Sequence, residues 1–285
     1  MTQSTIFPQE RATVVGVLNL TPDSFSDGGR FVSKGADLDL EAAVAEAEAL
    51  VASGAGMLDV GGESTRPGAE EVPIAVEIAR TRPLIEAMAK SISVPISIDT
   101  RKAAVAEAAL EAGATVVNDI SGLQFDPMLA GVTARAGAGI VLGHLRGDPV
   151  TMQRHVQFQD VVEEVAAELR ASADRALEAG IPAERIGVDP GIGFGKRLAH
   201  NLDLIANVGR IRRSVGLPVL VGPSRKSFLG ELTGEPVDRR VEATFAASAV
   251  AIFSGADAIR VHDVEGALRM ATVARALRDA RRDST

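Results

Sequence analysis

The chain has no cysteine among its 285 residues. Disulfide bonds, cysteine-ligated zinc and thiol catalysis are therefore excluded. Tryptophan and tyrosine are also missing, and aromatic residues make up only 3% of the chain. Since hydrophobic residues nevertheless reach 46%, the core must consist mainly of alanine, valine, leucine and isoleucine. This composition favours helices packed on a parallel sheet over an aromatic-rich β-sandwich.

Long apolar runs and basic runs are missing as well. No apolar run reaches the ~18 residues that a membrane-spanning helix needs. Residues 1–10 contain no apolar core of the kind found in a secretory signal. The formal net charge is −8, so nucleic acid and membranes are not expected as partners. We expect a cytoplasmic protein whose anionic ligands, if any, are met by local cations.

Apolar, β-rich runs alternate along the chain with alanine-rich helical patterns. Strands are expected at 13–19, 57–60, 95–99, 115–118, 139–142, 185–189, 218–221 and 257–261, and helices at 39–53, 72–91, 102–111, 128–135, 161–179, 201–215, 239–254 and 264–280. Within the strand runs apolar residues are continuous, which indicates strands covered on both faces. About eight such units predict an α/β fold, a single (β/α)8 TIM barrel with its catalytic groups at the C-terminal strand ends.

We place this barrel at 13–285, after an N-terminal extension at 1–12. An open doubly wound sheet is the other possibility. Against it, the glycine-rich dinucleotide fingerprint is missing after the first strand.

The run at 185–189 ends on Asp189, and a loop with three glycines and then Lys196 follow it. Glycines at this density let the backbone turn sharply and approach a ligand closely. On this stretch alone, Asp189 either caps a turn or binds a polar ligand. Lys196 is expected to start a helix or to lie at the surface.

Most of the predicted strands are followed by polar side chains. They are Asn19, Asp59, Asp99, Asn118, His144, Asp189, Arg260 and His262, together with the loops at 61–68 and 224–227. A barrel would bring these groups to one pocket. Carboxylate and amide oxygens suit a flat ligand with many N–H donors, whereas arginine, lysine and histidine suit a phosphate. The sequence therefore predicts a site for a nitrogen heterocycle with a phosphorylated arm.

The same regions carry recognisable motifs. In chain order they are NLTPDSFSDGG at 19–29, DVGGESTRPG at 59–68, SIDT at 97–100, NDI at 118–120, DPGIGFGK at 189–196, SRKSF at 224–228 and RVHDV at 260–264. This ordered set resembles the signatures of the dihydropteroate synthases, a family of pterin-binding enzymes, and the resemblance extends over residues 13–277.

The resemblance implies a transferase of folate and tetrahydrofolate biosynthesis with a TIM-barrel fold. It would join (7,8-dihydropterin-6-yl)methyl diphosphate to 4-aminobenzoate, forming 7,8-dihydropteroate and releasing diphosphate. The resemblance further implies Mg²⁺ as cofactor and a homodimer.

Residue roles follow from the same resemblance. It implies Asp99, Asn118, Asp189 and Lys226 for the pterin ring, Asn19 for Mg²⁺ and diphosphate, Thr65, Arg260 and His262 for diphosphate, and Arg66, Pro67, Phe194 and Ser227 for the aminobenzoate. Asp27, on the first loop, resembles the family carboxylate that faces the reacting cation and the metal. Asp27, Arg66 and Lys226 are the residues to which we assign catalysis.

Gly143 departs from the family pattern, which usually has a methionine there, and it should leave more room or a looser wall beside the pterin. Three other functions are alternatives to this one. A catalytically silent pterin-binding paralogue would be expected to lose Asp27, Arg66 or Lys226, and all three are present. A methyltetrahydrofolate:corrinoid methyltransferase needs no aminobenzoate loop and no cations for diphosphate. A Schiff-base aldolase would use Lys226 as nucleophile, but nothing else in the sequence points to one.

Overall fold

The computed structural model describes residues 5–8, 11–21, 38–66, 68–147, 151–152 and 156–282. The strands are β1 (Thr13–Asn19), β2 (Met57–Gly61), β3 (Ile96–Asp99), β4 (Val116–Asp119), β5 (Gly139–Gly143), β6 (Ile186–Asp189), β7 (Leu220–Val221) and β8 (Ala258–Val261). The helices are α1 (Leu40–Ala52), α2 (Ile74–Ser91), α3 (Ala103–Glu111), α4 (Leu129–Arg135), α5 (Val161–Glu178), α6 (Leu198–Ala206), α7 (Val208–Val215), α8 (Ser227–Thr233), α9 (Val241–Ser254) and α10 (Val264–Arg282), with two 3₁₀ turns at Ala183–Arg185 and Val237–Arg239.

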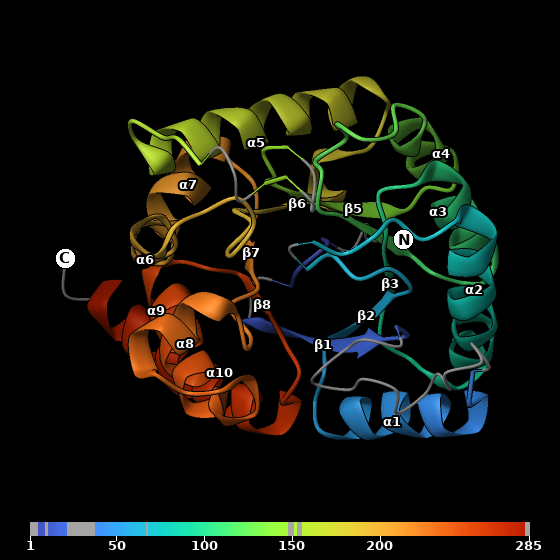
Figure 1. The fold of residues 1–285 in the computed structure, drawn as a ribbon, viewed down its shortest axis with the longest axis horizontal. Helices are drawn as coiled ribbons and strands as arrows, with labels where there is room; N and C mark the ends of the chain where they lie inside the picture. The colour runs from blue at the N-terminus through green and yellow to red at the C-terminus, as the bar shows by residue number, and fades with distance from the viewer. Residues whose placement is uncertain are drawn as a thin grey trace.

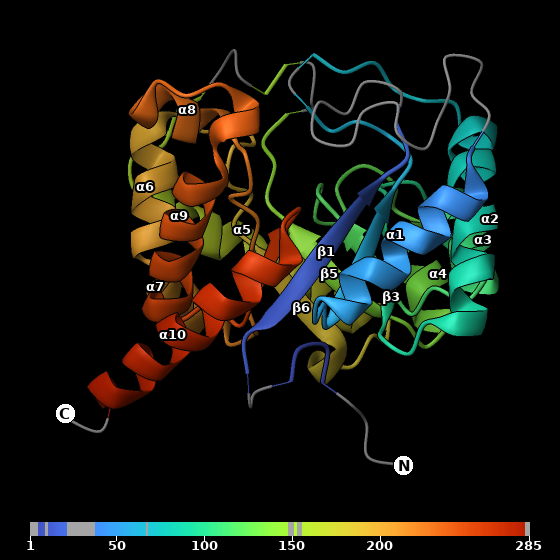
Figure 2. The same ribbon diagram turned by 90° about the horizontal axis from the view of Figure 1, so that it is seen from below.

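The strands form one parallel sheet in the order β6-β5-β4-β3-β2-β1-β8-β7. A bridge between Val188 of β6 and Val219, just before β7, joins the two ends of this sheet. The helices surround the resulting ring (Figure 1). The predicted (β/α)8 barrel is therefore confirmed. Because the strands are parallel, their carboxyl ends share one rim, toward which the arrow of β1 points in Figure 2.

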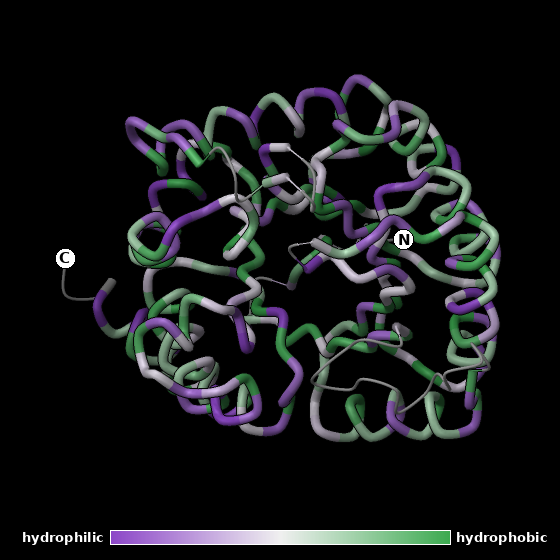
Figure 3. Tube along the Cα trace, in the orientation of Figure 1, coloured by the Kyte–Doolittle hydropathy of each residue, from purple (hydrophilic) through white to green (hydrophobic). Residues whose placement is uncertain are grey.

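Local sequence signals explain where several helices begin. The side chain of Asp39 accepts a hydrogen bond from the Ala42 amide at the start of α1. Asp160 does the same for the Val162 and Glu163 amides at the start of α5. Hydrophilic and hydrophobic residues alternate along the outer helices in Figure 3, as expected for helices with one face on the sheet. Among the described residues, no helix combines the length and apolar character needed to cross a membrane.

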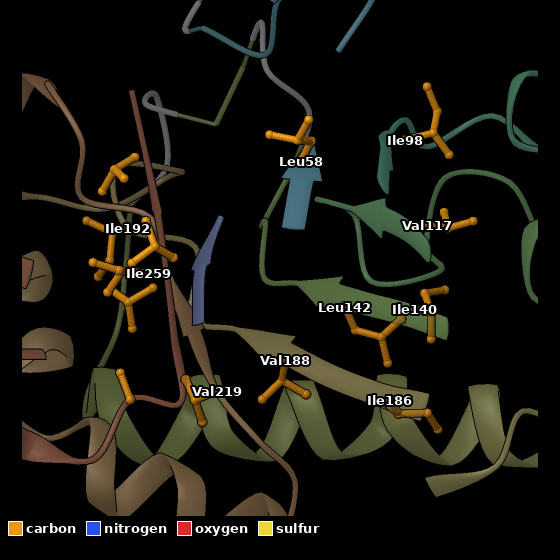
Figure 4. Close-up of a cluster of buried hydrophobic side chains, with 14 of the residues drawn as sticks. Leu58, Ile98, Val117, Ile140, Leu142, Ile186, Val188, Ile192, Val219 and Ile259 are labelled. Atoms are coloured by element: carbon orange, nitrogen blue, oxygen red, sulfur yellow. The ribbon is translucent and has the colours of Figure 1, made fainter. Parts of the chain in front are cut away.

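The barrel has an outer and an inner layer of buried side chains. Side chains from successive strands fill the outer layer between sheet and helices, as Figure 4 shows for Leu58, Ile98, Val117, Ile140, Leu142, Ile186, Val188, Val219 and Ile259. The inner layer includes Val15, Met57 and Val116, near the amino ends of their strands, and Ile6 and Phe7 pack against it. Residues that precede β1 thus close the mouth opposite the carboxyl-end rim.

One helix prediction was wrong in detail, and one helix was not predicted. The helix expected at 201–215 starts earlier and is divided into α6 and α7. Asn207 lies between them with a non-helical backbone (φ −109°, ψ 21°), and its side-chain amide donates to the Asp203 carbonyl. Such local hydrogen bonds compete with the helix backbone. Helix α8 was not predicted, because Ser227–Thr233 is too short to show a helical period.

Candidate active site

The carboxyl ends of the strands surround a cavity of about 650 Å³. Its lining includes eleven residues to which the sequence assigned a role: Asn19, Thr65, Arg66, Asp99, Asn118, Asp189, Phe194, Lys226, Ser227, Arg260 and His262. The other two, Asp27 and Pro67, lie outside the described residues. The structure thus brings the predicted site together, while the role of each residue in it stays a prediction.

A buried carboxylate, Asp59, organises the floor of this cavity. Asp59 is 1% exposed and lies within β2, two residues after Met57 and so on the same, inward face. Its Oδ2 accepts from Asn118 Nδ2 at 3.0 Å and from Arg260 Nε at 2.5 Å. Because the Asn118 amide gives its nitrogen to Asp59, Oδ1 is the end that remains for a ligand. The sequence placed Asp59 at a strand end but assigned it no function.

Arg260 bridges two carboxylates on the floor. Besides its contact with Asp59, its Nη2 donates to Asp99 Oδ2 at 2.8 Å. The predicted diphosphate contact must therefore come from the rest of the guanidinium or from rearrangement of these ion pairs. Arg260 in its observed place serves first to neutralise the floor.

Asp99 retains an acceptor for a ligand. Its Oδ1 is buried and has no hydrogen-bond partner among the described residues, which is uncommon for a carboxylate oxygen. Burial raises the pKa of Asp99 to about 7, against the opposing effect of Arg260. A ligand that presents N–H donors to the floor would satisfy this oxygen.

Asp189 combines the two roles that the sequence left open. Its Oδ1 accepts from the Gly191 amide at 2.7 Å and so caps the turn after β6, while the residue also lines the cavity. Burial raises the pKa of Asp189, and the nearby ammonium of Lys226 acts against this.

Lys226 is a cation in the lining of the same cavity. Its Nζ lies 3.9 Å from the centre of the Phe194 ring. Burial, together with the charge of Arg260, lowers the pKa of Lys226 to about 8.

The rim on the β7–β8 side carries hydroxyl and imidazole groups. His262 Nδ1 lies 2.8 Å from Ser224 Oγ. Burial and the neighbouring cation Arg225 lower the pKa of His262 to about 3, so in the ligand-free site it is neutral. The sequence grouped histidine with arginine and lysine as suited to a phosphate; without ligand, His262 is a neutral hydrogen-bonding group. Arg225 itself has φ +55°, and its backbone amide donates a hydrogen bond to Thr244 Oγ1 at 3.0 Å.

The loop after β2, which carries Thr65 and Arg66, is tied down by buried charges. Lys102 Nζ donates to Glu63 Oε2 at 2.6 Å and to Glu77 Oε2 at 2.8 Å. Glu63 also accepts from the Val72 amide. We call Glu63, Glu77 and Lys102 the loop anchor. The anchor was missed because a lysine and two glutamates scattered along the chain look like ordinary surface residues; only their burial identifies them.

Two further expectations were wrong. Gly143 leaves no extra room, since a Cβ there would lie 2.6 Å from the Ile120 Cα, and the Ile120 backbone fills the space. Lys196 is not at the surface: it is 4% exposed, and its Nζ lies 3.0 Å from Nδ1 of His144, a cavity-lining residue. One residue, the N-cap Arg197, separates Lys196 from the start of α6.

Comparisons with known proteins agree with this geometry. The model of the family described as pterin binding enzyme matches residues 15–262. A dihydropteroate synthase of Synechocystis is 46% identical over 269 residues, which cover 94% of this chain and 91% of that protein. The dihydropteroate synthase of Bacillus subtilis is 42% identical, over 92% of this chain and 87% of that protein.

Solved structures show the same similarity. A Yersinia pestis dihydropteroate synthase in a sulfonamide drug complex superimposes with a TM-score of 0.90 and 38% identity, over 98% of this chain and 100% of that chain. A Xanthomonas albilineans dihydropteroate synthase with 4-aminobenzoic acid gives a TM-score of 0.85 and 41% identity, over 94% of each chain.

Proposed function

The chain belongs to the dihydropteroate synthases, a family of pterin-binding enzymes, and on this premise we propose how its residues carry out the reaction. The enzyme joins (7,8-dihydropterin-6-yl)methyl diphosphate to 4-aminobenzoate in folate biosynthesis. The C–O bond to the diphosphate breaks, a C–N bond forms to the amine, and the amine loses a proton.

One observation carries the assignment of roles: the cavity has a floor of oxygen acceptors and a surround of cations and donors. Asp99, Asn118 and Asp189 supply the acceptors, and they suit the amino and ring N–H groups of a pterin. Lys226 supplies the donor beside them. The strongest single indication is Asp99 Oδ1, which has no hydrogen-bond partner in the part of the chain that the structure describes, because buried acceptors are normally satisfied by a donor.

The protein's part in the chemistry is electrostatic. A dihydropterin delocalises positive charge, so the bond to diphosphate can break before the amine attacks. Carboxylates on the floor stabilise the developing cation, while Thr65, Arg66, Arg260 and His262 receive the leaving diphosphate. The aniline nitrogen is already neutral and needs no base to become a nucleophile. Phe194, with Lys226 over its ring, forms the wall between pterin and aminobenzoate, which Ser227 and Arg66 border.

Magnesium is the proposed cofactor. Among the described residues, no cluster of three histidines or carboxylates could hold a metal by itself. Mg²⁺ commonly uses few protein ligands and is completed by water and substrate phosphates. The amide oxygen of Asn19, which lines the cavity, fits that pattern. When bound, the metal would neutralise charge on the leaving diphosphate.

Asp27 and Pro67, outside the described residues, complete the proposal. The resemblance assigns Asp27 to the cation and the metal, and Pro67 to the aminobenzoate. Both loops contain several glycines or prolines, as suits lids that exclude water from a reactive cation.

The protein is further proposed to be a cytoplasmic homodimer. Support for the dimer comes from α9 and α10, which pack side by side (Figure 1). They expose Val250, Phe253, Val273 and Leu277, the last two at 60% and 58%. Apolar side chains with so much exposed surface are typical of an interface between two copies of a chain. Light scattering of the purified protein should give twice the chain mass of 29.6 kDa. A measured mass equal to that of a single chain would contradict the proposed dimer.

Product analysis tests the function. Purified protein with both substrates and Mg²⁺ should form 7,8-dihydropteroate, identified by mass spectrometry. Tight pterin binding with no product formed would instead establish a silent pterin-binding paralogue.

A further inference from the structure

Lys196 is a buried cation for which the reaction as described has no use. Its ammonium group makes three hydrogen bonds: to Nδ1 of His144 at 3.0 Å, to the His144 carbonyl at 3.3 Å and to the Phe194 carbonyl at 2.9 Å. An ammonium has three N–H donors and no acceptor. Every donor of Lys196 therefore has a partner, and all three partners are neutral groups.

The partners of Lys196 belong to two segments that line the cavity. His144 directly follows β5, and its amide donates to the Asp189 carbonyl at 3.0 Å. Phe194 belongs to the loop after β6, in which Gly191, Gly193 and Gly195 all have positive φ. Lys196 thus connects the end of β5 to this glycine-rich loop, directly behind the side chains that face the ligand.

The backbone of this loop packs closely against His144 and Lys196. A Cβ at Gly191 would lie 2.0 Å from the His144 carbonyl oxygen and 3.2 Å from Lys196 Nζ. The Phe194 amide in turn donates to the Gly191 carbonyl at 3.0 Å. The position of the Phe194 ring, over which Lys226 lies, therefore depends on a backbone held from behind by Lys196.

The second ring nitrogen of His144 extends the network to helix α5. His144 Nε2 lies 3.0 Å from Glu168 Oε2, and Glu168 also pairs with Arg146. A carboxylate only accepts, so Nε2 carries the proton and Nδ1 is the acceptor for Lys196. Burial lowers the pKa of His144 to about 4, which agrees with a neutral ring in this tautomer.

A lysine in this place is costly. Burial lowers the pKa of Lys196 to about 7, although the charges of Asp189 and Glu168 oppose the change. An apolar side chain of similar length would avoid the desolvation of an ammonium. Retaining a charged group here suggests that its three hydrogen bonds matter to the site and not only to packing.

We infer that Lys196 is a positioning residue of the pterin site: by holding His144 and the Phe194 carbonyl, it fixes where the Phe194 ring and the Asp189 carboxylate stand in the cavity. This inference rests on the proposed function, because it takes the pterin diphosphate as the ligand that meets Asp189 and Phe194. It adds a residue that itself does not touch the substrate.

Steady-state kinetics of Lys196→Met test the inference. Methionine keeps the length of the side chain and removes the charge and all three hydrogen bonds. We expect the KM for pterin diphosphate to rise about 10-fold or more, since buried hydrogen bonds are lost, with a smaller change in kcat. Lys196→Gln keeps N–H donors and should restore part of the loss. Lys90→Met, at an exposed position on α2, is the matched control and should have the KM of the wild type.

A merely structural lysine gives a different result. It would lower the melting temperature or the active fraction of Lys196→Met, while the KM of the folded enzyme stayed within about twofold of the wild type; that outcome overturns the inference. If Lys196→Met does not fold, the same criterion applies to Lys196→Gln.

A spectroscopic test separates this inference from the proposed function. The chain has only four histidines, so ¹⁵N-histidine NMR resolves His144 in the absence of substrate. Wild-type His144 should be the Nε2–H tautomer at pH 7. Its Nδ1 resonance should move toward that of a free acceptor in Lys196→Met, and by a smaller amount in Lys196→Gln, which keeps N–H donors. An Nδ1 resonance that both variants leave unchanged would refute the contact, whether or not the enzyme forms dihydropteroate.

Discussion

At the scale of single residues, Asp59 connects two side chains that line the cavity, although it does not itself line the cavity. One of its oxygens holds both Asn118 and Arg260. It therefore decides which end of the Asn118 amide faces the ligand, and it keeps Arg260 beside Asp99. Such a residue cannot be recognised from its position near a strand end, because polar groups lie at or after the ends of most strands of the barrel.

Asp59→Asn should weaken recognition of the pterin more than it slows the chemical step. Asparagine removes one negative charge from Arg260 and offers an N–H₂ group toward which the Asn118 amide can turn its oxygen. We expect kcat/KM for pterin diphosphate to fall about 100-fold, the effect of losing one or two buried charged hydrogen bonds. Steady-state kinetics measure this, with exposed Asp203→Asn as control. A change of less than about threefold would show that Asp59 has no such role.

His144 makes a pH-dependent contribution to stability whose sign can be worked out. Its pKa is about 4 in the folded protein and about 6.5 in an unfolded chain. Below the unfolded value, protons bind the unfolded state more strongly, so the stabilisation present at pH 7 is lost as the pH falls toward 4.

Urea denaturation at pH 5 and at pH 7 measures this contribution. The free energy of unfolding of the wild type minus that of His144→Asn should be larger at pH 7 by about 2 kcal/mol. Taking the difference removes the opposing effects of Asp99, Glu77 and Asp189, whose pKa values are raised. Equal differences at the two pH values would mean that His144 titrates normally in the folded state.

At the scale of elements, the loop after β2 is positioned by the anchor of Glu63, Glu77 and Lys102. Lys102 lies just before α3 and reaches the Val72 carbonyl as well as both glutamates. Thr100 Oγ1 donates to the remaining oxygen of Glu77 at 2.7 Å. The loop that carries Thr65 and Arg66 is thus attached to the segment that follows β3.

Lys102→Met should loosen this loop and destabilise the protein. Removing the lysine leaves buried Glu77 without a cation and Glu63 with Arg101 as its remaining one. Breaking a buried ion pair in this way costs about 3–5 kcal/mol. Because Arg66 is proposed to border the aminobenzoate, the KM for that substrate should rise more than the KM for pterin diphosphate. Urea denaturation and kinetics, compared with Lys90→Met, measure both effects. Unchanged stability would show that the anchor is not the source of the loop's order.

The sequence predicted the bounds of some strands and helices more closely than those of others. Strands such as β5 and β6 are short apolar runs covered on both faces, and they were predicted almost to the residue. The division between α6 and α7 was missed because it involves a single residue, Asn207, whose side chain donates to the Asp203 carbonyl. Within the site, residues at strand ends such as Asp99 were predicted. Lys102 and Lys196 were not, because a lysine's burial follows from contacts between distant segments.

At the scale of the whole molecule, the fold explains how residues so far apart in sequence share one cavity. Asp59 and Arg260 are separated by most of the chain, yet β1 pairs with both β2 and β8. At the opposite end, Ile6 and Phe7 fill the barrel's mouth. The barrel is thus a packed core at the amino ends of the strands and a ligand site at their carboxyl ends. The central claim is that the cavity at the carboxyl ends catalyses the dihydropteroate synthase reaction.

The release of diphosphate tests this claim most directly. Diphosphate can be followed continuously while pterin diphosphate, 4-aminobenzoate and Mg²⁺ are supplied together and each is omitted in turn. The account predicts release only from the complete mixture, with one diphosphate for each dihydropteroate formed. Release at the same rate without 4-aminobenzoate, or none from the complete mixture despite tight pterin binding, would contradict it.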